Sequence, residues 1–139
     1  EGATIFISFC ALSEAKGMLI KMKIAQVSKE KNISLDGLRY YERIGLVPPV
    51  KRVKGGIREY SDEDLQWLDF MMEVRSAGVS IEPLIDYVRL CGEGLHTVPA
   101  RRDLWVDECD LLEEKILGLQ ETLAKIKGKV DHYNGMLKG

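Results

Sequence analysis

Apolar residues recur at alternating intervals of four and three along the last third of the chain. The series comprises Trp105, Cys109, Leu112, Ile116, Leu119, Leu123, Ile126, Val130, Tyr133 and Leu137. This heptad pattern is typical of a coiled coil, in which the apolar seam of one helix packs against a partner helix. Because so short a chain has no core to cover the seam, the pattern predicts a long dimerisation helix. The alternative is a helix that folds back antiparallel onto its own chain.

Two shorter helical patterns, separated by a tight turn, lie near the start of the chain. The first covers residues 24–31, and the second covers residues 35–44, where Leu35, Leu38, Tyr41 and Ile44 follow helical spacing. Ser34 is a good N-cap for the second helix, and Gly45 is a good residue to end it. Two short helices joined in this way form a helix-turn-helix.

Two short runs of strand-forming residues follow, over residues 50–53 and 57–60, on either side of Lys54-Gly55-Gly56. Paired glycines between such runs indicate a β-hairpin. The hairpin carries four basic residues, namely Lys51, Arg52, Lys54 and Arg58. A basic hairpin after a helix-turn-helix is a wing, so the sequence predicts a winged helix-turn-helix head.

Two further helices are expected before the long one, the first with Ser61 as its N-cap and the second with Ser80 as its N-cap. The predicted fold is therefore mainly α. Residues 1–21 form a leader or upstream extension, residues 22–96 form the DNA-binding head with its linker helices, and residues 97–139 form the coiled-coil dimerisation helix. A linker is expected over residues 94–99.

Charge is divided unequally along the 139 residues. Residues 22–61 hold nine Lys or Arg and four Asp or Glu, a net charge of +5, whereas residues 62–139 hold nine against sixteen, a net charge of −7. A local basic surface of this kind is typical of a nucleic-acid binder, even though the whole chain carries −2. Three distant cysteines argue against a disulfide framework or a zinc site and favour a reducing, cytoplasmic setting. The apolar run in the first residues is too short to span a bilayer, so no membrane partner is expected.

The stretch LRYYERIGL at residues 38–46 resembles the signature of the MerR family of transcription regulators. The following VPPVKRVKGGIREYSDEDL resembles that family's wing and the entry to its next helix. The C-terminal helix is similar to the family's dimerisation helix, which pairs protomers in an antiparallel coiled coil. The resemblance implies a homodimer that binds a pseudo-palindromic operator in double-stranded promoter DNA. It also implies that the dimer distorts the promoter spacer and so affects RNA polymerase indirectly.

The resemblance and the helix geometry together predict the residues that contact DNA. On the recognition helix, Ser34 caps the N-terminus, Leu35 and Asp36 face the bases, Arg39 contacts phosphate or guanine, and Tyr40 donates to phosphate. On the wing, Lys51, Arg52, Lys54 and Arg58 are expected at phosphates, and Tyr60 has either a phosphate or a packing role. Glu42 and Arg43 are expected to form a surface pair.

The section from Tyr87 to Trp105 resembles the aldehyde- and thiol-stress branch of the family, the AdhR- and NmlR-like regulators. Cys91 is then the candidate sensor, because a thiolate attacks electrophiles. The alternative is that Cys91 is simply a packing residue in the stripe of Leu84 and Val88. No metal site and no cofactor are expected, since no cysteine cluster flanks the long helix.

Two other classes of protein compete with a regulator. The first is a coiled-coil module that binds proteins and has no specific affinity for DNA. The second is an enzyme, which the sequence argues against because His96 and His132 have no nucleophile or paired carboxylate near them along the chain. The chain is therefore expected not to be an enzyme.

Overall fold

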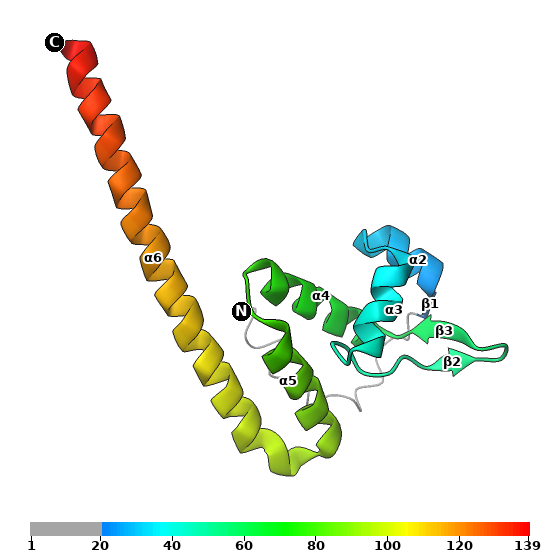
Figure 1. Ribbon diagram of the computed structural model, residues 1–139. Coiled ribbons are helices and arrows are strands. Elements are labelled where there is room, and N and C mark those ends of the chain that lie inside the picture. Colours follow the sequence, from blue (N-terminus) through cyan, green and yellow to red (C-terminus); the bar gives the residue numbers. More distant parts are fainter. Residues whose placement is uncertain (1–20) are drawn as a thin grey trace. The chain divides into compact units, whose positions relative to one another are not determined.

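The computed structural model describes residues 21–139, so the predicted leader lies outside the described residues except for Lys21. The helices are α2 (Ile24–Lys31), α3 (Leu35–Arg43), α4 (Asp62–Ser76), α5 (Ile81–Glu93) and α6 (Val98–Lys138), with a short 3-10 turn η1 (Leu95–Thr97). The strands are β1 (Met22–Lys23), β2 (Arg52–Val53) and β3 (Ile57–Tyr60) (Figure 1). The prediction of a mainly α fold with a wing and a long last helix is confirmed. The boundary between two compact units falls between Arg101 and Arg102.

The helix-turn-helix forms as the sequence predicts. α2 ends at Lys31, and its C-cap residue Asn32 adopts a left-handed conformation with φ of 53°. The hydroxyl of Ser34 then accepts a hydrogen bond from the Gly37 amide at 2.9 Å and so caps α3. Gly45, with φ of 83°, follows the C-cap residue Ile44 of α3, at a position where a residue with a Cβ would be strained.

The wing belongs to a three-stranded antiparallel sheet with β3 in the centre. Gly55 and Gly56 both have positive φ, which the tight turn between β2 and β3 requires. The hairpin projects away from the helices of the head (Figure 1). On its other edge β3 pairs with β1, where Met22 is opposite Tyr60. β1 was not predicted, because a two-residue strand has no periodicity of its own and exists only through its pairing.

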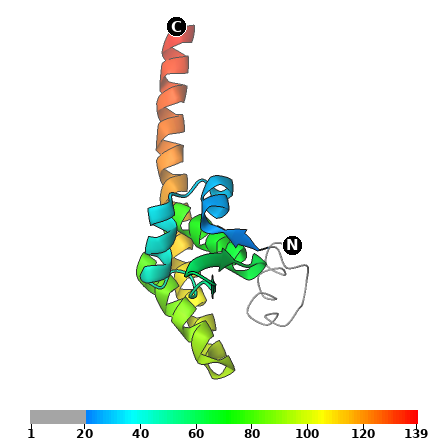
Figure 2. The ribbon, with the colours of Figure 1, turned by 90° about the vertical axis from the view of Figure 1, so that its right-hand side faces the viewer.

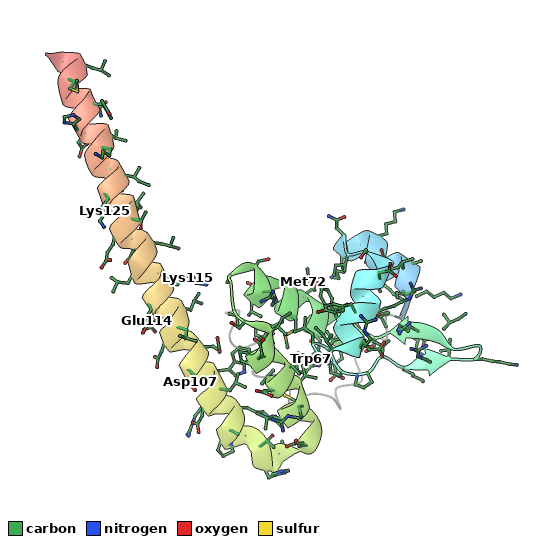
Figure 3. All side chains as sticks on the ribbon, in the orientation of Figure 1. Trp67, Met72, Asp107, Glu114, Lys115 and Lys125 are labelled. Carbon is green, nitrogen blue, oxygen red and sulfur yellow. The ribbon has the colours of Figure 1, made fainter. Side chains whose placement is uncertain are left out.

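Helix α4 begins with a capping box, in which Ser61 and Asp64 each satisfy the other's backbone amide. The apolar faces of the helices, together with Tyr60 of β3, form the core of the head, and the largest fully buried side chains include Tyr60, Leu38, Leu68, Met71 and Leu84. Trp67, labelled in Figure 3, lies with its ring centroid 5.6 Å from that of Tyr87 and links α4 to α5.

The junction between α5 and α6 differs from the sequence prediction. Ser80 occupies the N-cap position of α5, but its side chain makes no capping hydrogen bond. The expected linker over residues 94–99 is wrong, because η1 fills its first part and α6 already begins at Val98. Proline within the first helical turn is tolerated, so Pro99 does not delay the start of α6.

Helix α6 is a single helix of 41 residues. Figure 1 draws it as one continuous ribbon, and Figure 2 shows its C-terminal part from the side. At about 1.5 Å per residue it is roughly 60 Å long. Charged side chains such as Asp107, Glu114 and Lys125 stand along it (Figure 3). The seam positions from Ile116 to Leu137 are all exposed within a single chain. None of the helices in residues 21–139 combines the length and apolar character needed to cross a lipid bilayer.

Candidate nucleic-acid interface

The N-terminal side of α3 presents the residues expected to face the bases. Leu35 is 38% exposed, and the carboxylate of Asp36 is almost fully exposed. The Arg39 guanidinium lies one turn further along, with Nη1 3.3 Å from Asp36 Oδ1. An ion pair this exposed contributes little stability, so it orients the guanidinium without preventing a new partner from competing for it.

Tyr40, also predicted to contact DNA, is 41% exposed on α3. The guanidinium carbon of Arg43 lies 5.3 Å from the centroid of the Tyr40 ring, which is the range of a cation–π contact. Arg43 therefore contacts Tyr40, and the expected surface pair of Arg43 with Glu42 is wrong. The result is an aromatic ring and a cation side by side on the exposed face of the recognition helix.

The wing carries exposed cations at three of the four predicted positions. Lys51, Arg52 and Lys54 are exposed, and Arg52 Nη1 donates to the Gly56 carbonyl at 3.2 Å. Within residues 21–139, no hydrogen bond or ion pair engages the ammonium groups of Lys51 and Lys54. These two lysines are therefore the wing cations most available to an anionic partner.

Arg58, the fourth predicted wing cation, is instead engaged inside the head. Its Nε donates to Glu42 Oε1 at 2.6 Å, and the exposed fractions of the two side chains are 16% and 13%. Glu42 Oε2 accepts a second hydrogen bond, from the Val50 amide at 2.7 Å. A phosphate contact was expected for Arg58 because its position on a basic hairpin is visible in the sequence, whereas a contact to α3 sixteen residues away is not.

The surroundings of Glu42 stabilise its charged form. Partial burial raises the pKa of Glu42, whereas the hydrogen bonds from Arg58 and from the Val50 amide lower it. The positive charges of Arg58 and Arg52 act in the same direction, so the pKa of Glu42 lies below its usual value. Glu42 is therefore ionised at neutral pH and holds the wing to α3 as a carboxylate.

Tyr60 is a packing residue, which decides between its two predicted roles. Only 1% of the residue is exposed, and its hydroxyl has no hydrogen-bond partner within residues 21–139. Burial, followed by the negative charge of Glu42, raises the pKa of Tyr60 above its usual value. Since the hydroxyl does not reach the surface, a phosphate contact by Tyr60 is not compatible with this structure.

The buried guanidinium of Arg101 donates hydrogen bonds at the C-terminal end of α5, a role that was not predicted from the sequence. Arg101 is 8% exposed, its Nε donates to the Thr97 hydroxyl at 2.9 Å, and its Nη2 donates to the Gly94 carbonyl at 2.7 Å. The Thr97 hydroxyl is also 2.7 Å from both the Leu90 and the Gly94 carbonyl oxygens. A cation at the carbonyl end of a helix is favourable, so this network holds α5, η1 and the first turn of α6 together.

Cys91, the predicted sensor, is half-buried near the end of α5, and Cys109 on the seam is exposed. Cys91 follows Leu90, whose carbonyl belongs to the Arg101 network. Nearby Arg89 pairs with Glu93 at 2.7 Å, and Arg102 pairs with Asp103 at 2.9 Å. Within residues 21–139 no three His, Cys, Asp or Glu side chains come together as a metal-binding group.

A capped recognition helix beside a cation-bearing hairpin defines a winged helix-turn-helix protein. The pattern of the MerR HTH regulatory protein family matches residues 22–90. The chain is also 50% identical over 93 residues to the HTH-type transcriptional regulator AdhR of Bacillus subtilis, a match that covers 67% of this chain and 66% of that protein. The matched part is thus just under two thirds of that relative's length.

Two solved structures share both sequence and fold with the chain. A MerR family regulator from Listeria monocytogenes is 42% identical with a TM-score of 0.79, over 81% of this chain and 86% of that one. HiNmlR, solved bound to promoter DNA and described as lacking the sensor domain, is 26% identical with a TM-score of 0.74, over 83% and 91% of the two chains. The chain therefore belongs to the MerR family and is a DNA-binding transcription regulator.

Proposed function

We propose that this regulator binds an inverted-repeat promoter site as a homodimer, with α3 in the major groove and the wing on the flanking backbone. The observation that carries the proposal is a capped helix with exposed N-terminal side chains, beside a hairpin with two unengaged lysines. In this arrangement Leu35, Asp36 and Arg39 face base edges, while Tyr40, Lys51, Arg52 and Lys54 contact phosphates.

The homodimer rests on the exposed seam of α6. An apolar stripe of this length is not stable in water without a cover, and a second copy supplies a complementary one. Trp105, Cys109 and Leu112 begin the seam, and Ile116, Leu119, Leu123, Ile126, Val130 and Tyr133 continue it. A two-fold dimer places two recognition helices on two half-sites and distorts the DNA between them, which changes how RNA polymerase engages the promoter.

Salt dependence of duplex binding tests the function and separates it from a coiled-coil interaction module without specific DNA binding. A regulator with several phosphate contacts loses affinity steeply as salt rises, with a slope of about −0.9 for each contact in a plot of log affinity against log salt. We expect a steep slope with any duplex and tighter binding to the chain's own promoter. Absence of duplex binding at low salt would favour the interaction module.

For the signal, we propose that Cys91 reacts with an aldehyde or an oxidant. With an aldehyde, the Cys91 sulfur bonds to the carbonyl carbon, and the thiol proton ends on the carbonyl oxygen. The adduct adds bulk at the residue that follows Leu90, whose carbonyl accepts a hydrogen bond from Arg101 at the start of α6. A Cys91→Ser variant is expected to lose aldehyde-dependent activation, whereas Cys109→Ser retains it. Normal activation of Cys91→Ser would rule out this sensor.

A further inference from the structure

The carboxylate of Glu42 attaches the wing to the recognition helix at two separate points. Glu42 Oε2 accepts a hydrogen bond at 2.7 Å from the amide of Val50, which lies just before β2. Glu42 Oε1 accepts a second hydrogen bond at 2.6 Å from Nε of Arg58, which lies on β3. Because the two points lie on the two arms of the hairpin, the wing cannot tilt against α3 without breaking one of these hydrogen bonds. We call this unit of Glu42, Val50 and Arg58 the wing clamp.

The wing also needs a negative charge at this place. The register of the hairpin puts Arg52 directly opposite Arg58. Like charges in directly opposed positions destabilise an antiparallel pair. Glu42 supplies the opposing charge, and its interaction with both guanidinium groups is favourable. Without the carboxylate, two arginines would face each other on two neighbouring strands with no counter-charge between them.

The clamp lies close to the two unengaged wing lysines. Lys51 follows Val50 in the chain. The Lys51 carbonyl accepts a hydrogen bond at 2.8 Å from the amide of Glu59, the residue after Arg58. Lys54 lies in the turn that the same two strands carry. The clamp is therefore one of the contacts, besides the pairing of β3 with β1, that set where Lys51 and Lys54 lie relative to α3.

From this arrangement we infer that Glu42 is a positioning residue for DNA binding, which fixes the wing so that Lys51 and Lys54 reach phosphates while α3 lies in the groove. The inference rests on the proposed function. It gives Arg58 a role within the clamp in place of a phosphate contact. It also means that an acidic residue favours the binding of DNA, although its negative charge by itself repels the phosphates.

The test compares variants of the full chain by the salt slope of binding to a duplex of about 30 base pairs with arbitrary sequence, since the phosphate contribution does not depend on sequence. Glu42→Gln removes the charge at constant size. The double variant Lys51→Ala/Lys54→Ala defines the slope without wing contacts. Asp69→Asn is the matched control, because it also removes one carboxylate from an ion pair in the head, with Lys31 at 2.9 Å, away from the wing.

We expect Glu42→Gln to flatten the slope by roughly 3 to 4 in a dimer, about 0.9 for each of two lysines in two wings. Adding Lys51→Ala/Lys54→Ala to Glu42→Gln should then change the slope no further, because the contacts are already lost. Asp69→Asn should keep the slope of the unmodified protein. If Glu42 does not position the wing, Glu42→Gln removes only a negative charge and leaves the slope unchanged or makes it steeper. That result overturns the inference.

A second variant covers the case in which Glu42→Gln does not fold. Glu42→Asp keeps the charge on a shorter side chain that cannot reach both Val50 and Arg58, so the salt slope should again be flatter. Adding Lys51→Ala/Lys54→Ala to this variant should then change the slope by less than it does in the unmodified protein. A Glu42→Asp slope equal to that of the unmodified protein, with a fully additive lysine effect, also overturns the clamp. If the unmodified chain itself binds no duplex, the proposed function fails before the clamp is tested.

Discussion

At the scale of single residues, buried polar atoms determine which basic and aromatic side chains of the wing are available to DNA. Lys51 and Lys54 have no partner in the described part of the chain, whereas Arg58 and Tyr60 are covered. From the sequence alone, all four residues are candidates for phosphate contacts on the wing. Arg58 differs from the two lysines because Glu42 approaches the hairpin from α3 and engages it, and Tyr60 differs because its side chain packs in the core.

Replacing Glu42 should change stability in a pH-dependent way. A carboxyl group whose pKa is lowered on folding stabilises the fold above its unfolded value, about 4.5, and this contribution is lost as pH falls through the folded pKa. At about pH 7 we expect Glu42→Gln to lower the free energy of unfolding by about 2 kcal/mol. This loss is smaller than for a fully buried ion pair, because both side chains keep some exposure. The gap between the two proteins should narrow as pH falls below the unfolded value and through the lowered folded pKa of Glu42.

Chemical denaturation of both proteins across that pH range measures the gap. Asp64, whose pKa is raised by burial, has the opposite pH dependence, but it is present in both proteins and cancels in their difference. A gap that stays constant from neutral to acid pH would show that the charge of Glu42 contributes nothing to stability.

The Tyr60 hydroxyl should be dispensable. Tyr60→Phe removes a buried hydroxyl that has no partner in residues 21–139, so the free energy of unfolding should rise by about 1 kcal/mol. Duplex affinity and its salt slope should stay unchanged. Thermal unfolding and duplex titration provide the two readouts, and a weaker affinity with a flatter slope would return Tyr60 to the DNA contacts.

At the scale of helices and strands, the sequence predicts what local rules control and misses what distant contacts create. Ser34 and Ser61 both cap their helices as expected, because a cap depends on residues only three positions away. β1 and the wing clamp were not predicted, since each joins segments that lie far apart in the sequence. The Arg101 network was missed for another reason, because residues 94–99 were expected to be a linker and not the start of a helix. The identity of Glu42 and Arg58 was visible, but their meeting required the fold.

The Arg101 network should make a measurable contribution to the stability of the head. Arg101→Ala leaves the Gly94 carbonyl and the Thr97 hydroxyl without a charged donor, so the free energy of unfolding should fall by about 2 kcal/mol. Arg102→Ala is the control, because Arg102 is exposed and its ion-pair partner is the adjacent Asp103. Equal effects of the two substitutions in denaturant unfolding would contradict a special role for Arg101.

At the scale of the whole molecule, the heptad seam is the strongest signal in the sequence, and it lies on a continuous helix in the structure. A periodic pattern identifies such a helix without any knowledge of the partner. What the seam packs against depends on a second surface, which the periodic pattern does not identify. The antiparallel homodimer therefore stays a prediction.

Two leucines on α6 allow a matched test of the seam. Leu119 lies on the seam and Leu117 does not, although both are largely exposed in a single chain. Leu119→Asp places a charge in the proposed interface and should shift the protein towards monomers in analytical ultracentrifugation, with a loss of duplex affinity. Leu117→Asp should stay dimeric. If both variants remain dimers, the seam is not the interface.

The most direct test of the central claim is selection of binding sites from a randomised duplex library by the full chain. A two-fold dimer of winged helix-turn-helix heads should enrich an inverted repeat with a fixed spacing between its half-sites. Conversion of Arg39 to Ala should then relax the base preference at one position in each half-site. Enrichment of a single unrepeated site, or of no site at all, would contradict a dimeric regulator that reads DNA through α3.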